Sequence, residues 1–122
     1  MRTIGQHAFK GNKITSINLP ASVRVIDNEA FANNQITSLT IPNGVERIMV
    51  RSFDGNPLTT LVIPASLYDA MYNPFPDTLT RVTLPANSYA MEALGESLRN
   101  FYIRQGRRAG VYVKNGSVWT RQ

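Results

Sequence analysis

The side chains that could carry acid–base or metal chemistry are few in this chain. His7 is the only histidine and there is no cysteine, so thiolate chemistry, disulfides and cysteine-based metal sites are excluded. The eight carboxylates show no paired-acid, HExxH or EF-hand spacing. No glycine-rich loop opens a helix, so nucleotide binding has no support. We therefore expect no catalytic residue, no metal ligand and no cofactor.

Positive charge gathers at the C-terminal end. Residues 1–96 hold seven basic and eight acidic side chains, whereas residues 97–122 hold six basic and no acidic ones. Tyr102, Tyr112 and Trp119 are interleaved with these cations, a combination that suits an acidic polymer such as an acidic glycan, nucleic acid or an anionic surface. The simpler interpretation is a soluble terminal cap, and no nucleic-acid motif is present. The candidate anion-binding residues are Arg104, Arg107, Arg108 and Lys114.

Hydroxyl side chains recur beside a repeated apolar pattern and form the main candidate binding surface. Threonine suits any exposed strand through its β-branch, so the pattern has a purely structural interpretation. The functional interpretation is a flat, hydroxyl-rich concave face that binds a protein or peptide, with the apolar Val62 and the charged Arg81 near its C-terminal edge. The candidate residues are Thr37, Ser38, Thr40, Thr59, Thr60, Val62, Thr80, Arg81 and Thr83.

A repeat of about 22 residues must position these side chains. "GNKITSINLP" at 11–20 returns as "NNQITSLTIP" at 33–42, "GNPLTTLVIP" at 55–64 and "DTLTRVTLP" at 77–85. Aligned columns include Phe9, Phe31, Phe53 and Phe75, and also Ile4, Ile26, Ile48 and Ala70. Several columns at one fixed period predict a solenoid of stacked coils.

Each coil is expected to contain one parallel strand and one returning limb. The last apolar residues of each phrase alternate as in a half-buried strand, and the following proline ends the strand. The limb, with Ile26, Ala30 and Phe31 facing inward, is expected to be a short helical turn or irregular arc. Asn12, Asn34 and Asn56 recur before the strand, where an amide can bond its own and the neighbouring coil. The phenylalanines should stack into a spine, and His7, in a variable column, should be solvated.

The C-terminal residues predict a cap. Residues 88–99 are expected to form an amphipathic helix that begins at Ser88, and residues 100–121 an antiparallel hairpin or meander. Asn115-Gly116 is a type I′ hairpin signal, which also accounts for the formal glycosylation acceptor Asn115-Gly116-Ser117. The predicted division is therefore 1–87, four repeats, and 88–122, an α+β cap.

The N-terminal end has no corresponding cap. Its first coil should expose an apolar end and a strand edge, which soluble repeat proteins cover. We expect coverage by further repeats or by a second copy in a two-fold homodimer, since the cap blocks head-to-tail stacking. The candidate self-association residues are Ile4, Phe9, Ile14, Ile17 and Leu19.

The phrase "IDNEAFANNQITSLTIPNGVERI" resembles the leucine-rich repeats of the BspA-like, or TpLRR, class, over roughly residues 4–87. The tail "FYIRQGRRAGVYVKNGSVWT" is similar to the segment that follows such repeats in spirochaete members. The resemblance implies an α/β solenoid, a right-handed coil with a concave parallel sheet. It also implies a non-enzymatic protein- or peptide-binding role, often in adhesion to host molecules. Nothing in the sequence predicts a transmembrane segment or a signal peptide; the resemblance suggests a surface, periplasmic or secreted location.

Overall fold

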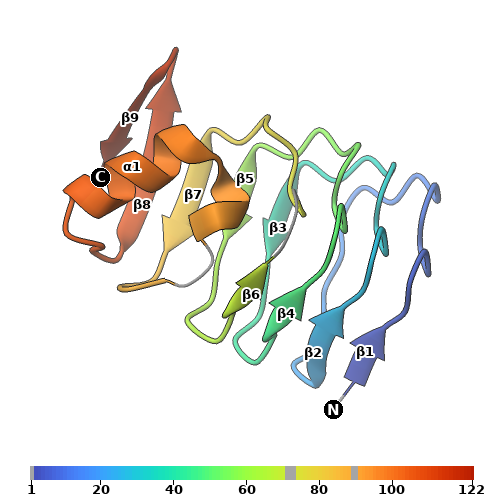
Figure 1. Ribbon diagram of the computed structural model, residues 1–122. Coiled ribbons are helices and arrows are strands. Elements are labelled where there is room, and N and C mark those ends of the chain that lie inside the picture. The colour runs from blue at the N-terminus through green and yellow to red at the C-terminus, as the bar shows by residue number, and fades with distance from the viewer. Residues whose placement is uncertain (1, 71–73, 89–90) are drawn as a thin grey trace.

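The computed structural model describes residues 2–70, 74–88 and 91–122 of the chain. Within these ranges seven strands build four coils, and a 3-10 helix, one α-helix and two further strands follow. Figure 1 shows the coils stacked side by side, with the N-terminus at one end and the helix and final strands at the other. The predicted solenoid with parallel strands is confirmed.

A smaller sheet of four parallel strands forms one side of the solenoid. Its order is β1-β2-β4-β6, and Ile4 pairs with Ile26, Ile26 with Ile48 and Ile48 with Ala70. These are the residues of one predicted column, so the 22-residue period is the register of the sheet. The strands are β1 (Arg2–Ile4), β2 (Val23–Ile26), β4 (Arg47–Ile48) and β6 (Asp69–Ala70).

In the described residues the returning limb is an irregular arc and not a helical turn, so the second of the two predicted alternatives is confirmed. It begins in the smaller sheet and continues as two successive turns, in which Ala30 N–H donates to Asp27 and Ala32 N–H donates to Glu29. Glu29 has a φ of 54°, and His7 and Arg51 in the same column have 60° and 53°. A right-handed helix needs negative φ, so these residues interrupt it in the first three coils. The predicted burial of Ile26, Ala30 and Phe31 is confirmed.

A larger sheet forms the other side and carries the hydroxyl-rich segments. Its order is β3-β5-β7-β8-β9, parallel from β3 to β7 and antiparallel from β7 onward. Residues 15–19 of the first coil form no strand, contrary to expectation. The strands are β3 (Ser38–Thr40), β5 (Thr60–Val62), β7 (Arg81–Leu84), β8 (Gly110–Asn115) and β9 (Val118–Arg121).

A column of phenylalanines runs through the core, as predicted. The ring centroids of successive residues lie 5.2, 5.3 and 5.9 Å apart, with planes within 17° of parallel. Phe31 and Phe53 are buried, but Phe9 in the first coil is 44% exposed. The stack is therefore open at the N-terminal end.

The asparagine column ties neighbouring coils together, also as predicted. The Oδ1 atom of Asn34 accepts from Asn12 N–H and Ile14 N–H of the preceding coil, each at 2.9 Å. Its Nδ2 atom donates to the carbonyls of Phe9 and Phe31, each at 2.9 Å. One coil later Asn56 accepts from Ile36 N–H and donates to the carbonyls of Phe31 and Phe53 in the same way. Gly55 lies against Asn33, and its φ of 73° and the very short distance between a Cβ placed there and Asn33 Oδ1 both favour glycine.

The cap helix lies further along the chain than predicted. A 3-10 helix, η1 (Met91–Leu94), precedes α1 (Glu96–Arg104), and residues 89–90 of the predicted helix lie outside the described residues. Ser88 does not cap the helix; its buried backbone N–H donates to the Tyr102 hydroxyl at 3.0 Å. Residues 100–104, predicted to be extended, are helical because Leu98 and Tyr102, four residues apart, face the core together.

The helix ends in a glycine motif that the sequence analysis overlooked. Arg107 N–H donates to the carbonyl of Tyr102 and Gly106 N–H to that of Ile103, with Gly106 at a φ of 76°. This pair of bonds is the Schellman motif, for which Gly106 was the available signal.

The predicted hairpin is confirmed, but its strands join the repeat sheet. β8 pairs with β7, so Tyr112 lies opposite Val82 in the core. The turn residues are Gly116 and Ser117, and only Gly116 has a positive φ. That pattern is type II′ and not the expected type I′.

Candidate protein-binding face

Alternation along β3, β5 and β7 places the candidate residues on the outer side of the larger sheet. Leu39, Leu61 and Val82 point into the core and are almost completely buried. The residues on either side of each therefore point outward, since successive side chains in a strand alternate. The sequence-predicted face is in this way gathered on one surface.

The strand register arranges this surface in two rows. One row follows Ser38, Thr60 and Arg81, and the other follows Thr40, Val62 and Thr83. The antiparallel pairing of β8 adds Val113 opposite Arg81 and Val111 opposite Thr83. We call the whole surface the Thr face; its members are Ser38, Thr40, Thr60, Val62, Arg81, Thr83, Val111, Val113 and, on β9 opposite Val113, Thr120.

The remaining candidates, Thr37, Thr59 and Thr80, have a structural role. The hydroxyl of Thr59 donates to the Thr37 carbonyl at 3.3 Å, and that of Thr80 to the Thr59 carbonyl at 3.5 Å. The backbone N–H groups of Thr59 and Thr80 bond the same carbonyls. This column therefore links coils at the entry to each strand, and it borders the Thr face.

Sequence reasoning missed the members of the Thr face that lie on the hairpin, Val111, Val113 and Thr120. The two valines give the face its apolar character. Both are half-buried, and together with Val62 they set apolar groups on both sides of Thr83 and beside Arg81. Their alternation with buried Tyr112 was visible, but their partner strand was not. Arg81 is exposed and forms no ion pair among the described residues, so its guanidinium is free to meet an incoming acceptor.

The candidate anion-binding residues do not form one site. Arg104 lines a hollow between α1 and the hairpin, whereas Lys114 lines a different pocket. Arg107 and Arg108 are exposed in the loop after α1, where the Arg108 carbonyl accepts the Tyr112 hydroxyl at 2.6 Å. Burial raises the pKa of Tyr112, in keeping with a structural role.

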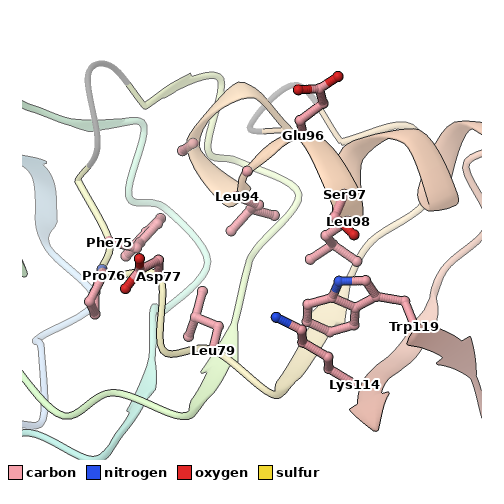
Figure 2. A pocket seen from close by; sticks show the side chains of 12 residues that line it. Phe75, Pro76, Asp77, Leu79, Leu94, Glu96, Ser97, Leu98, Lys114 and Trp119 are labelled. Atoms are coloured by element: carbon pink, nitrogen blue, oxygen red, sulfur yellow. The ribbon is translucent and has the colours of Figure 1, made fainter. Parts of the chain in front are cut away.

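The pocket beside Lys114 separates the fourth coil from the cap. It has a volume of about 210 Å³, and Figure 2 shows Trp119 and Lys114 on one side and Phe75, Asp77 and Leu79 on the other. Leu94 and Leu98 close it from above in this view. Polar residues from both sides line it, Asp77, Glu96, Ser97 and Lys114, and it lies at the seam between the repeats and the cap.

The self-association candidates line an open apolar hollow at the N-terminal end. Its volume is about 380 Å³, and Val23 and Phe31 form its floor. Ile4, Ile14, Ile17 and Leu19 are only partly buried there, and Phe9 is exposed. The structure thus brings all five candidates together on one surface.

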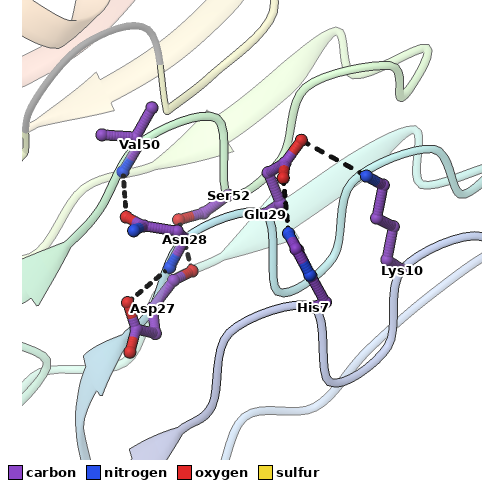
Figure 3. Close-up of polar contacts among 7 residues, drawn as sticks. All are labelled: His7, Lys10, Asp27, Asn28, Glu29, Val50 and Ser52. Atoms are coloured by element: carbon purple, nitrogen blue, oxygen red, sulfur yellow. Dashed lines mark hydrogen bonds and ion pairs between the residues drawn. The ribbon is translucent and has the colours of Figure 1, made fainter.

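His7 is exposed, as predicted, but it has a carboxylate partner. Its Nε2 atom lies 2.6 Å from Oε2 of Glu29, and Lys10 Nζ lies 3.4 Å from Oε1 (Figure 3). These contacts, that of His7 first, lower the pKa of Glu29. Nearby, Asn28 links two coils by accepting Val50 N–H at 3.2 Å (Figure 3).

Removing the imidazole should raise the pKa of Glu29. A lowered pKa in the folded state stabilises folding above the unfolded-state pKa and loses that contribution as the pH falls through the folded value. We expect His7→Gln to shift the carboxyl titration of Glu29, followed by carbon-detected NMR, to higher pH. Lys10→Gln is the matched control and should shift the titration of Glu29 less. An equal shift would mean that nearby positive charge, and not the hydrogen bond with His7, lowers the pKa of Glu29.

No group of three or more His, Cys, Asp or Glu residues within the described ranges could hold a metal ion. In the same part of the chain, no helix is long and apolar enough to cross a bilayer.

Comparison with protein families identifies the repeat. The family described as BspA type leucine rich repeat region (6 copies) matches residues 2–103, which extends beyond the four coils into α1. No curated protein and no solved structure matches the chain. Leucine-rich repeats are protein-interaction scaffolds. The chain belongs to the BspA-type leucine-rich-repeat family.

Proposed function

We propose that the protein is a non-enzymatic binding module whose Thr face recognises a partner protein or peptide. The observation that carries this is the composition of the face where β5, β7 and β8 meet. Val62, Val111 and Val113 there surround an unpaired Arg81, within a field of short hydroxyl side chains. Interfaces combine apolar contact with a few arginine anchors, and short hydroxyl side chains lose little entropy on burial.

The family resemblance extends this proposal to cellular context. BspA-like proteins suggest a surface, periplasmic or secreted location and adhesion to host or partner proteins. A flat face built on strands suits such a role, since its backbone is held by coils on both sides and does not need to reorganise on binding. Adhesion is therefore the biological role that we propose for the Thr face.

Changing Val62 and Arg81 together to serine should abolish this recognition without unfolding the protein. Neither side chain is in the core, so circular dichroism should be unchanged. Binders are selected from a displayed library of protein fragments at 0.15 M salt and are then measured against the double variant. We expect at least about a tenfold loss of affinity, because a removed interface anchor typically costs more than about 1 kcal/mol.

The matched control changes one apolar and one cationic residue elsewhere, Tyr68→Ser with Arg2→Ser, both exposed. Binders that lose affinity equally to both double variants would remove the Thr face from consideration. Affinity that falls steeply with salt and responds to neutralising Arg104, Arg107 and Arg108 would instead indicate the acidic-polymer alternative.

The apolar hollow at the N-terminal end supports a second proposal, a homodimer through that end. Phe9 presents one ring face to solvent while stacking on Phe31 with the other. Arg2, Lys10 and Lys13 lie in the same coil, which has no carboxylate, so paired ends repel one another.

Salt should therefore strengthen this association by screening the repulsion. Sedimentation equilibrium at tens of micromolar is expected to show a dimer fraction that rises with salt and disappears in Phe9→Asp. Tyr68→Asp, at a similarly exposed aromatic side chain on another surface, should leave the dimer intact. A monomer under all these conditions would contradict the proposal.

A further inference from the structure

The larger sheet ends in an edge strand with unused backbone groups. β9 pairs with β8 on one side and with no described strand on the other. Just beyond the paired residues, Gln122 N–H donates to the Val111 carbonyl at 2.8 Å. Because bonded and non-bonded pairs alternate in an antiparallel ladder, Thr120 is bonded to Val113. The N–H and C=O groups of Trp119 and Arg121 must then face outward from the sheet.

The bonding of β8 on its other side gives the same assignment. Lys114 N–H donates to the Thr80 carbonyl at 2.8 Å, which directs Lys114 and Tyr112 toward β7. The intervening residues, Val111 and Val113, therefore direct their N–H groups toward β9. Two independent bonds thus fix which groups of β9 are free.

This edge lacks the usual protection against pairing. Natural edge strands carry a proline, a bulge or an outward-reaching charge. β9 has no proline, and its register with β8 is continuous. The one charged side chain on it does not reach beyond the edge, because the exposed guanidinium of Arg121 lies back across the sheet and donates to the Ala109 carbonyl at 3.2 and 3.1 Å.

A hollow lies next to this edge on the side of α1. It has a volume of about 310 Å³ and is lined by Phe101, Trp119 and Val118, with Ser97, Ser117 and Arg104. Figure 1 shows α1 crossing in front of β8. Val118 is 61% exposed. A side chain that descends beside Trp119 from an added strand would enter an aromatic-walled hollow with Arg104 on its margin.

The positive charge around β9 favours an acidic partner. Residues 97–122 contain six cations and no carboxylate. We propose that the β9 edge binds an extended acidic peptide as a sixth, antiparallel strand. The preferred sequence, read from N to C, is an acidic residue, any residue, then an apolar residue. In that register the acidic residue lies opposite Arg121 and the apolar residue lies opposite Trp119, with its side chain in the hollow.

The experiment uses the full chain and the peptide acetyl-Thr-Glu-Thr-Leu-Thr-amide. Binding is followed by the emission of Trp119, the only tryptophan, which lines the hollow. N-methylation of the Glu or Leu nitrogen removes a donor that faces β9 and should weaken binding by about tenfold or more. N-methylation of the central Thr nitrogen, which faces solvent, should change the affinity by less than about twofold.

Replacing the peptide's Glu by Lys should also weaken binding. In the Arg104→Gln variant of the protein, the difference in affinity between the Glu peptide and the Lys peptide should be smaller. The Val62→Ser, Arg81→Ser double variant should bind the peptide unchanged, which separates this site from the Thr face. Equal effects of the two kinds of N-methylation, equal affinity for the Lys peptide, or no binding at millimolar peptide would each overturn the proposal.

Discussion

Phe31→Ala is expected to destabilise the protein by about 3–5 kcal/mol, a large part of the stability of a domain of this size. Phe31 is 3% exposed, and its ring is stacked on both sides, against Phe9 at 5.2 Å and Phe53 at 5.3 Å. Truncation leaves a cavity that the flanking rings cannot fill, because each is held in its own coil by the inter-coil hydrogen bonds. Urea denaturation monitored by circular dichroism measures the loss.

Phe9→Ala provides the matched control in the same column. Its ring stacks on one side only and is 44% exposed, so truncation creates no closed cavity. We expect a loss of about 1 kcal/mol. Similar losses of unfolding free energy for the two variants would mean that each ring contributes separately to the stack. A loss below about 1 kcal/mol for Phe31→Ala would contradict its place in the core.

The sequence predicted the coil because the repeat period is itself a structural register. Residues 22 apart, such as Ile4, Ile26 and Ile48, become direct partners in a parallel sheet, so a column of apolar residues is a column of contacts. The phenylalanine stack and the asparagine column follow from the same 22-residue spacing. Side chains that repeat at this spacing were correctly placed without any knowledge of the backbone.

Local conformation was harder to predict where a segment is too short to show a period. β4 and β6 contain two residues each, which cannot display alternation. Residues 100–104 alternate like a strand, but Tyr102 also lies four residues after Leu98, which is a helical spacing. The structure forms the helix because both side chains then reach the core. The positive φ of His7, Glu29 and Arg51 left no signal, since no column of glycine or asparagine marks it.

The candidate binding face was predicted on the coils but not on the cap. Thr60, Arg81 and Thr83 could be assigned because they repeat. Val111 and Val113 could not, since they join the face through a pairing between β7 and β8 that spans an intervening helix. Which strand the hairpin would pair with depends on how α1 packs, and no spacing in the chain encodes that.

Asn34→Ala should be as damaging as the loss of a core aromatic side chain, although only one amide group is removed. Asn34 is 5% exposed, and its side chain satisfies backbone groups in two adjacent coils. Without it the N–H groups of Asn12 and Ile14 and the carbonyl of Phe9 lose their hydrogen-bond partner. The carbonyls of Phe31 and Ala32 lose one contact each but keep a second donor, from Asn56 and Gly11. An orphaned buried polar group costs about 1–3 kcal/mol, and partial hydration near the first coil reduces the sum, so we expect a loss of about 3–5 kcal/mol in urea denaturation.

Asn12 supplies the control, because it holds the same place in a coil with no described neighbour on its outer side. Its amide donates only to the Lys10 carbonyl, at 3.5 Å, and the residue is exposed, so Asn12→Ala should cost less than about 1 kcal/mol. Asn34→Asp refines the test, since a carboxylate keeps both acceptor contacts but turns a negative charge toward three carbonyls. That variant should regain stability on acidification, when the carboxyl protonates and can donate one hydrogen bond. Equal losses for Asn12→Ala and Asn34→Ala would show that the asparagine column arranges the coils but does not add to the free energy of unfolding.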